Sequence, residues 1–185
     1  GSQPHPPPRG TQDRRPAMSA TLAADNGVQY RPVQGGGRNG AEHSSCNALL
    51  AVCDAGDEVL IPSPYWVSYP EMVRLAGGEP VIVQTSERNG WKMTAAEFEN
   101  AMTPRTKMAI MNSPNNPSGA VYTREELEAI VNVAAEEEIY ILSDEIYEKL
   151  IYDGVKHVSI ASLSKEASDL TITLNGVSKS YPMTA

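Results

Sequence analysis

The chain has 185 residues, of which 41% are hydrophobic, and a formal net charge of −8 from 15 basic and 23 acidic residues. Such a chain is long enough to bury a hydrophobic core, and its length predicts one main folded unit. The acidic balance argues against nucleic acid and anionic membranes as partners, although a small anionic ligand could still bind locally.

Two further features concern the compartment and the cysteines. No apolar run is long enough to span a bilayer, and the first residues lack the charged and apolar regions of a signal peptide, so the cytoplasm is the expected location. Cys46 and Cys53 are seven residues apart, which places them on one face of a helix. We interpret both as small core residues and expect neither a disulfide nor a metal site.

Residues 1–24 form an atypical amino-terminal segment. The first 16 residues are rich in proline and arginine and almost lack apolar side chains, so we expect them to be disordered or extended. A short helix is predicted over 17–24, ending near Asn26. A flexible loop rich in glycine follows at 34–40.

From Asp57 onward, short apolar runs alternate with helical segments. Thr94 with Glu97, and Thr123 with Glu126, place a hydroxyl and a carboxylate three residues apart, which is the pattern of a capping box. The predicted strands are 58–61, 80–83, 107–111, 139–142 and a last one that starts near 169; the predicted helices are 40–50, 67–75, one opened by Thr94, and 124–137. This alternation predicts an α/β fold with a mostly parallel sheet and helices on both faces.

Chemically useful side chains follow the predicted strands, where open α/β sheets bind their ligands. Lys179 comes after the last strand. Most lysines are solvated surface charges, but an amine that is partly desolvated at a strand end can attack a carbonyl and form a Schiff base. Asp144 directly follows a buried strand, where a carboxylate needs a helix to cap or a cation such as a protonated ring nitrogen.

Three more side chains suit a flat ring. Trp66 offers a face for stacking, although an aromatic residue after a strand is more often part of the core. Asn116 could donate its amide to a ring oxygen, or could serve the turn formed with its flanking prolines. Tyr147 lies three residues after Asp144, on the same face of a predicted helix, and could bind the same ring.

The predicted helix at 40–50 follows the glycine-rich loop. The free N–H groups of its first turn and the helix dipole would suit a phosphate group. An ordinary helix start explains the same sequence equally well.

At these residues the chain resembles the fold-type I pyridoxal-phosphate enzymes, in particular class I aminotransferases of the bacterial aspartate aminotransferase type. The motifs that carry the resemblance are, in the family's order, 64–78, 115–119, 143–147 and 178–179. The resemblance covers residues from about 25 to 185. It implies that 25–185 is the large domain, which binds pyridoxal 5′-phosphate (PLP).

The resemblance also implies a role for each ring-binding residue. Lys179 would be the catalytic residue, which holds the cofactor as a Schiff base and moves the substrate proton. Asp144 would keep the ring nitrogen protonated, so that the ring withdraws electrons. Tyr147 and Asn116 would bind the phenolic oxygen, and Trp66 would stack on the ring.

For the phosphate, the resemblance implies the backbone N–H groups of Ala41 and Glu42, together with Ser178. Two arginines of the family, one for this phosphate and one for the substrate carboxylate, would come after the last residue, Ala185. Gly35–Gly37 and Pro182 also depart from the family pattern. We therefore expect a truncated large domain without the small C-terminal domain.

The expected function is that of a biosynthetic aminotransferase that moves an amino group between an amino acid and a 2-oxo acid, with this chain inactive alone and the full-length family homodimeric. One alternative is a non-catalytic remnant that at most binds PLP or a partner chain. Another is a different fold-type I enzyme such as a β-lyase, which shares the same lysine and aspartate.

Overall fold

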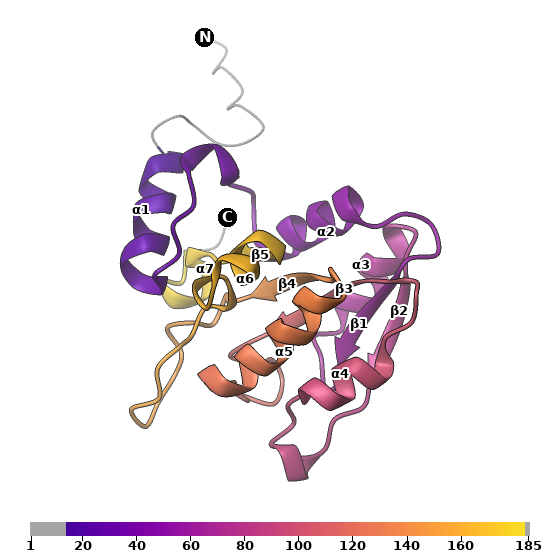
Figure 1. The fold of residues 1–185 in the computed structure, drawn as a ribbon. Helices are drawn as coiled ribbons and strands as arrows, with labels where there is room; N and C mark the ends of the chain where they lie inside the picture. Colours follow the sequence, from indigo (N-terminus) through magenta and orange to yellow (C-terminus); the bar gives the residue numbers. More distant parts are fainter. Residues whose placement is uncertain (1–13, 184–185) are drawn as a thin grey trace.

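The computed structural model describes residues 14–183, and its centre is a five-stranded sheet (Figure 1). The strands are β1 (Glu58–Pro62), β2 (Glu79–Val83), β3 (Thr106–Asn112), β4 (Tyr140–Asp144) and β5 (Thr171–Leu174). Their order in the sheet is β2-β1-β3-β4-β5, and every neighbouring pair is parallel. The predicted parallel α/β fold is confirmed.

Helices cover both faces of the sheet (Figure 1). The α-helices are α1 (Arg14–Asn26), α2 (Ala41–Val52), α3 (Ser68–Leu75), α4 (Ala95–Ala101), α5 (Arg124–Glu136), α6 (Lys165–Leu170) and α7 (Val177–Ser180); the short 3-10 helices are η1 (Pro32–Gln34), η2 (Glu87–Asn89) and η3 (Ile160–Ser162). Helices α2 and α3 pack on one face, and α4, α5 and α6 pack on the other.

The side chains of β1 show how the sheet separates two cores. Val59 and Ile61 pack with α2 and α3, whereas Leu60 packs with α4 and α5, and all three are fully buried. Successive side chains of a strand point to opposite faces, and both faces are covered here. This is why the strand is a continuous apolar run rather than an alternating one.

Local sequence signals set the helix ends. Thr94 Oγ1 accepts from the N–H of Glu97, and Oε2 of Glu97 accepts from the N–H of Thr94, so this predicted capping box is confirmed. The same pair of bonds joins Thr123 and Glu126 at the start of α5. Each box satisfies backbone donors that the first turn of a helix leaves free.

A glycine pair ends α3 and turns the chain into β2. Gly77 has a φ of 89°, a conformation that side chains with a Cβ rarely adopt. A Cβ on Gly78 would lie 3.1 Å from the carbonyl oxygen of Asp57. Glycine at both positions therefore lets the helix end close against the start of β1.

The amino-terminal region differs from the prediction. Helix α1 starts at Arg14, so residues 14–16 are helical where an extended or disordered segment was expected. The added turn continues the predicted helix over 17–24 toward its amino end. Residues 1–13 lie outside the described part of the chain, so the expectation of disorder there stays untested.

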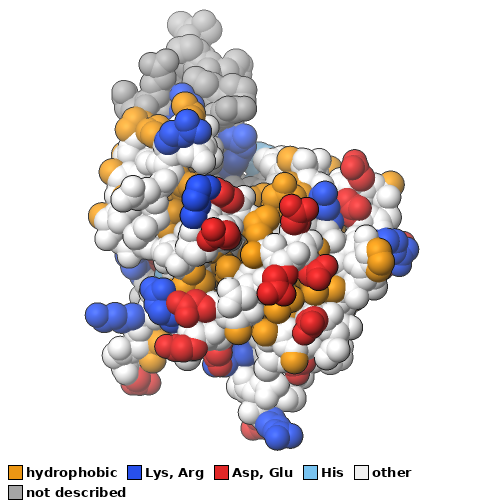
Figure 2. Space-filling model, viewed as in Figure 1, with side chains coloured by type: hydrophobic (Ala, Val, Ile, Leu, Met, Phe, Trp, Pro, Cys, Tyr) orange, Lys and Arg blue, Asp and Glu red, His pale blue; other side chains and the backbone are white. Residues whose placement is uncertain are grey.

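The two cysteines and the surface charge agree with the sequence analysis. Cys46 and Cys53 are both free, half-buried and buried respectively, as expected of small core residues. No helix within residues 14–183 is long and apolar enough to cross a membrane. Acidic side chains are spread over the face that carries α4 and α5 (Figure 2), in line with the net charge.

Candidate functional site

The candidate site lies at the carboxyl edge of the sheet, where β3, β4 and β5 end. In the register of the sheet, Asp144 pairs with Asn112 of β3 on one side and with Leu174 of β5 on the other. Strands β3 and β4 end one and two residues later than predicted, so Asn112 and Asp144 are their last residues rather than residues that follow them. Parallel strands thus bring distant segments of sequence to one edge.

Asp144 is a buried carboxylate, 6% exposed. The hydroxyl of Tyr69 donates to Oδ2 at 2.6 Å, and the backbone N–H of Ile146 donates to Oδ1 at 3.2 Å. Burial raises the pKa of Asp144, and these two hydrogen bonds offset only part of that rise. Within residues 14–183 no cationic side chain pairs with this carboxylate, which leaves room for a cation of a ligand.

Tyr69 is a site residue that the sequence analysis missed. It lies on α3 and shares the buried face of this helix with Met72 and Val73, since residues three and four apart lie on one face. Burial and the neighbouring Asp144 both raise the pKa of the phenol, so that it stays protonated and can donate. A tyrosine on an apolar helix face needs a partner for its hydroxyl, and this was the available signal.

Asn112 is a second missed residue, and it ties two loops together. Its Nδ2 donates to the carbonyl oxygen of Asp144 at 2.9 Å, and its Oδ1 accepts from the N–H of Asn116 at 2.8 Å. Asn116 in turn donates from Nδ2 to the hydroxyl of Tyr147 at 3.2 Å. The structure therefore brings Asn116 and Tyr147 together, as expected of two residues that bind one ring oxygen.

Tyr147 reaches this position from a turn. Residues 146–149 form turns after β4 rather than the predicted helix, so the argument that Tyr147 and Asp144 share a helical face was wrong. The turn follows the strand closely, with the N–H of Ile146 bound to Asp144. Tyr147 is the next residue in this turn, and its hydroxyl accepts from Nδ2 of Asn116.

Lys179 lies on the one-turn helix α7, directly after β5. Its Nζ is 6.0 Å from the centre of the Tyr147 ring, and it forms no hydrogen bond or ion pair within the described residues. A Cβ on Gly176 would lie 2.9 Å from Cδ1 of Ile146, so glycine permits the close approach of the two loops. Lys179 is exposed, which differs from the expected partial desolvation.

Trp66 lies on the loop between β1 and α3 and is 39% exposed, so it is not a core residue. Its Nε1 donates to Oε1 of Glu42 at 2.6 Å, and the hydroxyl of Ser68 donates to the same oxygen at 2.8 Å. Glu42 lies in the first turn of α2. The two hydrogen bonds lower the pKa of Glu42, and the positive charge of Lys179 lowers it a little further.

The residues expected at the phosphate come from two helices, α2 and α7. Ala41 and Glu42 open α2, and their N–H groups belong to a first turn whose amides lack intrahelical acceptors. Ser178 is half-buried on α7 beside Lys179. Helix α2 packs near β5, and the effect of Lys179 on Glu42 indicates that α7 lies within electrostatic range of this turn.

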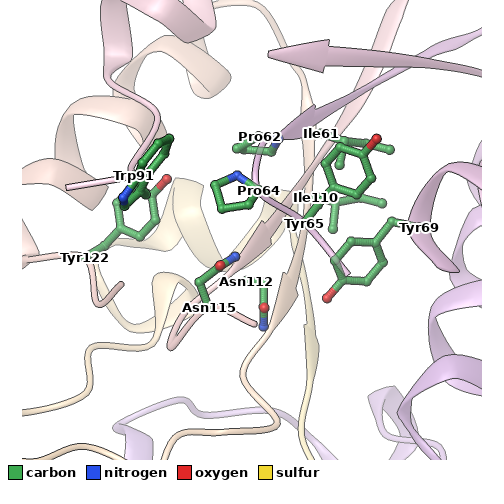
Figure 3. Close-up of a pocket in the computed structure, with 10 residues that line it drawn as sticks. All are labelled: Ile61, Pro62, Pro64, Tyr65, Tyr69, Trp91, Ile110, Asn112, Asn115 and Tyr122. Atoms are coloured by element: carbon green, nitrogen blue, oxygen red, sulfur yellow. The ribbon is translucent and has the colours of Figure 1, made fainter. Parts of the chain in front are cut away.

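A small pocket adjoins the site (Figure 3). It shares Tyr69 and Asn112 with the site, whereas Trp66, Asp144 and Lys179 do not line it. The lining residues are Ile61, Pro62, Pro64, Tyr65, Tyr69, Trp91, Ile110, Asn112, Asn115 and Tyr122. Trp91 and Tyr122 form one wall, Tyr65 and Tyr69 form the other, and the two asparagines lie between them (Figure 3).

A parallel α/β domain with these groups at one sheet edge has the architecture of the pyridoxal-phosphate-dependent transferases. The structure superimposes on the crystal structure of the aspartate aminotransferase from Rhizobium meliloti with a TM-score of 0.94, at 37% identity. The superposition covers 97% of this chain and 45% of that one. A mutant aspartate aminotransferase from Thermus thermophilus gives a TM-score of 0.92 at 42% identity, covering 96% and 48%.

Sequence relatives agree with these structures. The chain is 48% identical over 178 residues to an aspartate aminotransferase of Bacillus sp. (strain YM-2), which covers 96% of this chain and 45% of the relative. It is 52% identical over 163 residues to that of Geobacillus stearothermophilus, covering 88% and 42%. The chain thus spans a little under half the length of these relatives.

Residues 5–185 match the family model of aminotransferase class I and II. The chain belongs to this family.

Proposed function

We propose that this chain forms the cofactor-binding part of a PLP-dependent aminotransferase, which moves an amino group between an amino acid and a 2-oxo acid. The observation that carries the proposal is the buried carboxylate of Asp144, which lies one strand away from the segment of Lys179 and has no cationic partner within the described residues. The names of the relatives support the same activity.

The residues present fit the chemistry of PLP. A buried carboxylate with a raised pKa is costly unless a cation or a proton shared with a ligand compensates it, and a protonated ring nitrogen supplies both. The paired amide of Asn116 and hydroxyl of Tyr147 offer donors for a ring oxygen. When bound, PLP supplies an aldehyde that condenses with amines and a ring that withdraws electrons from the substrate.

The roles of the side chains follow from their positions. Asp144 would hold the proton on the ring nitrogen, and Tyr69 would keep this carboxylate oriented. Trp66 would cover one ring face and exclude water from it. Lys179 would bind the cofactor aldehyde through Nζ and would later move a proton at the Cα atom of the substrate.

The phosphate is the group for which this chain offers the weakest contacts. Ala41, Glu42 and Ser178 would provide N–H groups and a hydroxyl, whereas bidentate arginine contacts are the strong kind. Among the described residues, Arg74, Arg105 and Arg124 pair with glutamates. We therefore expect the 185-residue chain alone to transaminate more slowly than ordinary enzymes, below about 1 per second.

An absorbance titration tests the proposal. The purified chain is mixed with PLP, then with aspartate, and then with a 2-oxo acid, while the spectrum and the products are followed. The aminotransferase is supported if a new absorbance band appears with PLP and shifts when aspartate is added, and if a new amino acid forms from the 2-oxo acid. A band that never responds to amino acids would favour a remnant that only binds PLP, and release of pyruvate from a β-substituted amino acid would favour a β-lyase.

A further inference from the structure

Glu42 links two segments that meet at the candidate site. Its Oε1 accepts from Nε1 of Trp66 at 2.6 Å and from the hydroxyl of Ser68 at 2.8 Å. Glu42 belongs to the first turn of α2, whereas the two donors come from the loop after β1 and the start of α3. One carboxylate oxygen therefore joins the beginning of α2 to the side chain of Trp66, which lies just before α3.

The indole of Trp66 is not enclosed by the core. Core side chains are held by contacts on all sides, but Trp66 is 39% exposed and the next residue, Val67, is exposed as well. A half-exposed ring that lacks such packing can rotate about two side-chain torsions. A hydrogen bond to an ionised carboxylate is stronger than one to a neutral acceptor, and it also fixes the direction of the indole N–H.

The charge of Glu42 makes this acceptor a strong one. The hydrogen bond from Trp66 is the largest cause that lowers the pKa of the Glu42 carboxyl, followed by the bond from Ser68. The carboxyl is therefore ionised at neutral pH. Its position in the first turn of α2 is favourable too, because the amino end of a helix attracts negative charge.

We propose that Glu42 is a positioning residue, whose carboxylate fixes the orientation of the Trp66 indole at the site. Glu42 would act through Trp66 and not by touching substrate. This inference rests on the proposed function only where it concerns PLP, since the link between Glu42 and Trp66 exists in the chain without a ligand.

Nuclear magnetic resonance of the indole groups tests the link directly. The chain contains two tryptophans, Trp66 and Trp91, so a ¹⁵N-labelled sample gives two indole N–H signals, which Trp91→Phe assigns. In Glu42→Ala the Trp66 signal should move upfield, and its exchange with solvent should speed up about ten-fold or more. In Glu42→Gln the neutral amide oxygen can still accept, but more weakly than a carboxylate, so the signal should lie between those of the parent and of Glu42→Ala.

Two controls are built into the chain. The Trp91 signal should stay unchanged in every Glu42 variant. Glu71→Ala removes an exposed glutamate of α3 whose partner is Arg74, and it should leave both indole signals in place. Glu42 is exposed, so its variants should fold, which circular dichroism checks. An unchanged Trp66 signal and exchange rate in Glu42→Ala would overturn the proposal.

A PLP titration of the same variants separates positioning from a mere surface bond. We expect Glu42→Ala to bind PLP several-fold more weakly than the parent, and Glu42→Gln, which keeps a weaker acceptor, to bind with an affinity between the two. Equal affinities of all three would show that the bond between Glu42 and Trp66 has no effect on the site. No PLP binding by any variant, with the indole signals behaving as expected, would instead refute the proposed function and leave the Glu42–Trp66 link intact.

Discussion

The hydroxyl of Tyr69 donates a 2.6 Å hydrogen bond to Oδ2 of Asp144. Asp144 ends β4, whereas Tyr69 lies on α3, and 75 residues separate them along the chain. Both residues are almost fully buried: Tyr69 is 3% exposed and Asp144 is 6% exposed. The bond therefore gives each of two costly buried groups a partner and connects a covering helix to the functional edge of the sheet.

Tyr69→Phe should destabilise the chain by about 1–3 kcal/mol, because it leaves a buried carboxylate oxygen without its donor. It should also raise the pKa of Asp144 further, since this bond lowers it. Urea unfolding at several pH values measures both effects. Tyr122→Phe is the matched control: its hydroxyl, also buried, accepts from the N–H of Met93, so its loss should cost stability without changing the pH dependence due to Asp144.

Asp144→Asn should reveal the raised pKa of this carboxyl. Burial makes the folded chain hold the Asp144 proton more tightly than the unfolded chain does. The contribution of this carboxyl to the free energy of unfolding is fully present below its ordinary pKa of about 3.9. This contribution is lost as the pH rises through the folded-state pKa. The parent should thus lose stability relative to Asp144→Asn as the pH rises above about 4.

Glu42→Gln provides a control of opposite sign for that experiment. The pKa of Glu42 is lowered by its hydrogen bonds, so its carboxyl stabilises the folded chain above the ordinary pKa and this stability is lost as the pH falls. The parent should therefore become more stable relative to Glu42→Gln as the pH rises. A stability difference between the parent and Asp144→Asn that does not vary with pH would contradict the assigned effect of burial.

Lys179→Ala should abolish the covalent label that borohydride reduction leaves on the chain after incubation with PLP. The expected reason is that Lys179 is the lysine next to the Tyr147 ring, at the end of β5. Mass spectrometry of the reduced chain measures the label and locates it. Lys149→Ala is the control, because this lysine pairs with Asp25, and its loss should leave the label in place. Full labelling of Lys179→Ala would refute the role of Lys179.

Asn112→Ala should cost about 1–3 kcal/mol of stability, because it leaves the N–H of Asn116 without its acceptor and the buried carbonyl of Asp144 with the N–H of Ser113 as its remaining donor. It should also weaken PLP binding, since Asn116 would lose its anchor. Chemical unfolding and a PLP titration measure the two effects. Asn89→Ala, which removes a partly exposed amide bound to Glu97, should change stability by less than about 0.5 kcal/mol. Similar losses in both variants would contradict the argument.

Much of the fold was determined by local sequence. The apolar runs of β1 and β3, the glycines after α3 and the capping boxes at Thr94 and Thr123 each act within a few residues, so that strands, helices and their order could be predicted. The alternation of these elements then required a parallel sheet. The positions of Lys179 and Asp144 at strand ends followed from the same reasoning.

The contacts within the site were decided by the tertiary structure. Asn112 meets Asp144 because β3 and β4 are neighbours in the sheet, and Tyr69 meets it because α3 covers that face. Glu42 meets Trp66 because α2 packs beside α3. These bonds join residues far apart in sequence, and the strand order and helix packing that bring them together are set by burial over the whole domain, which no local pattern encodes.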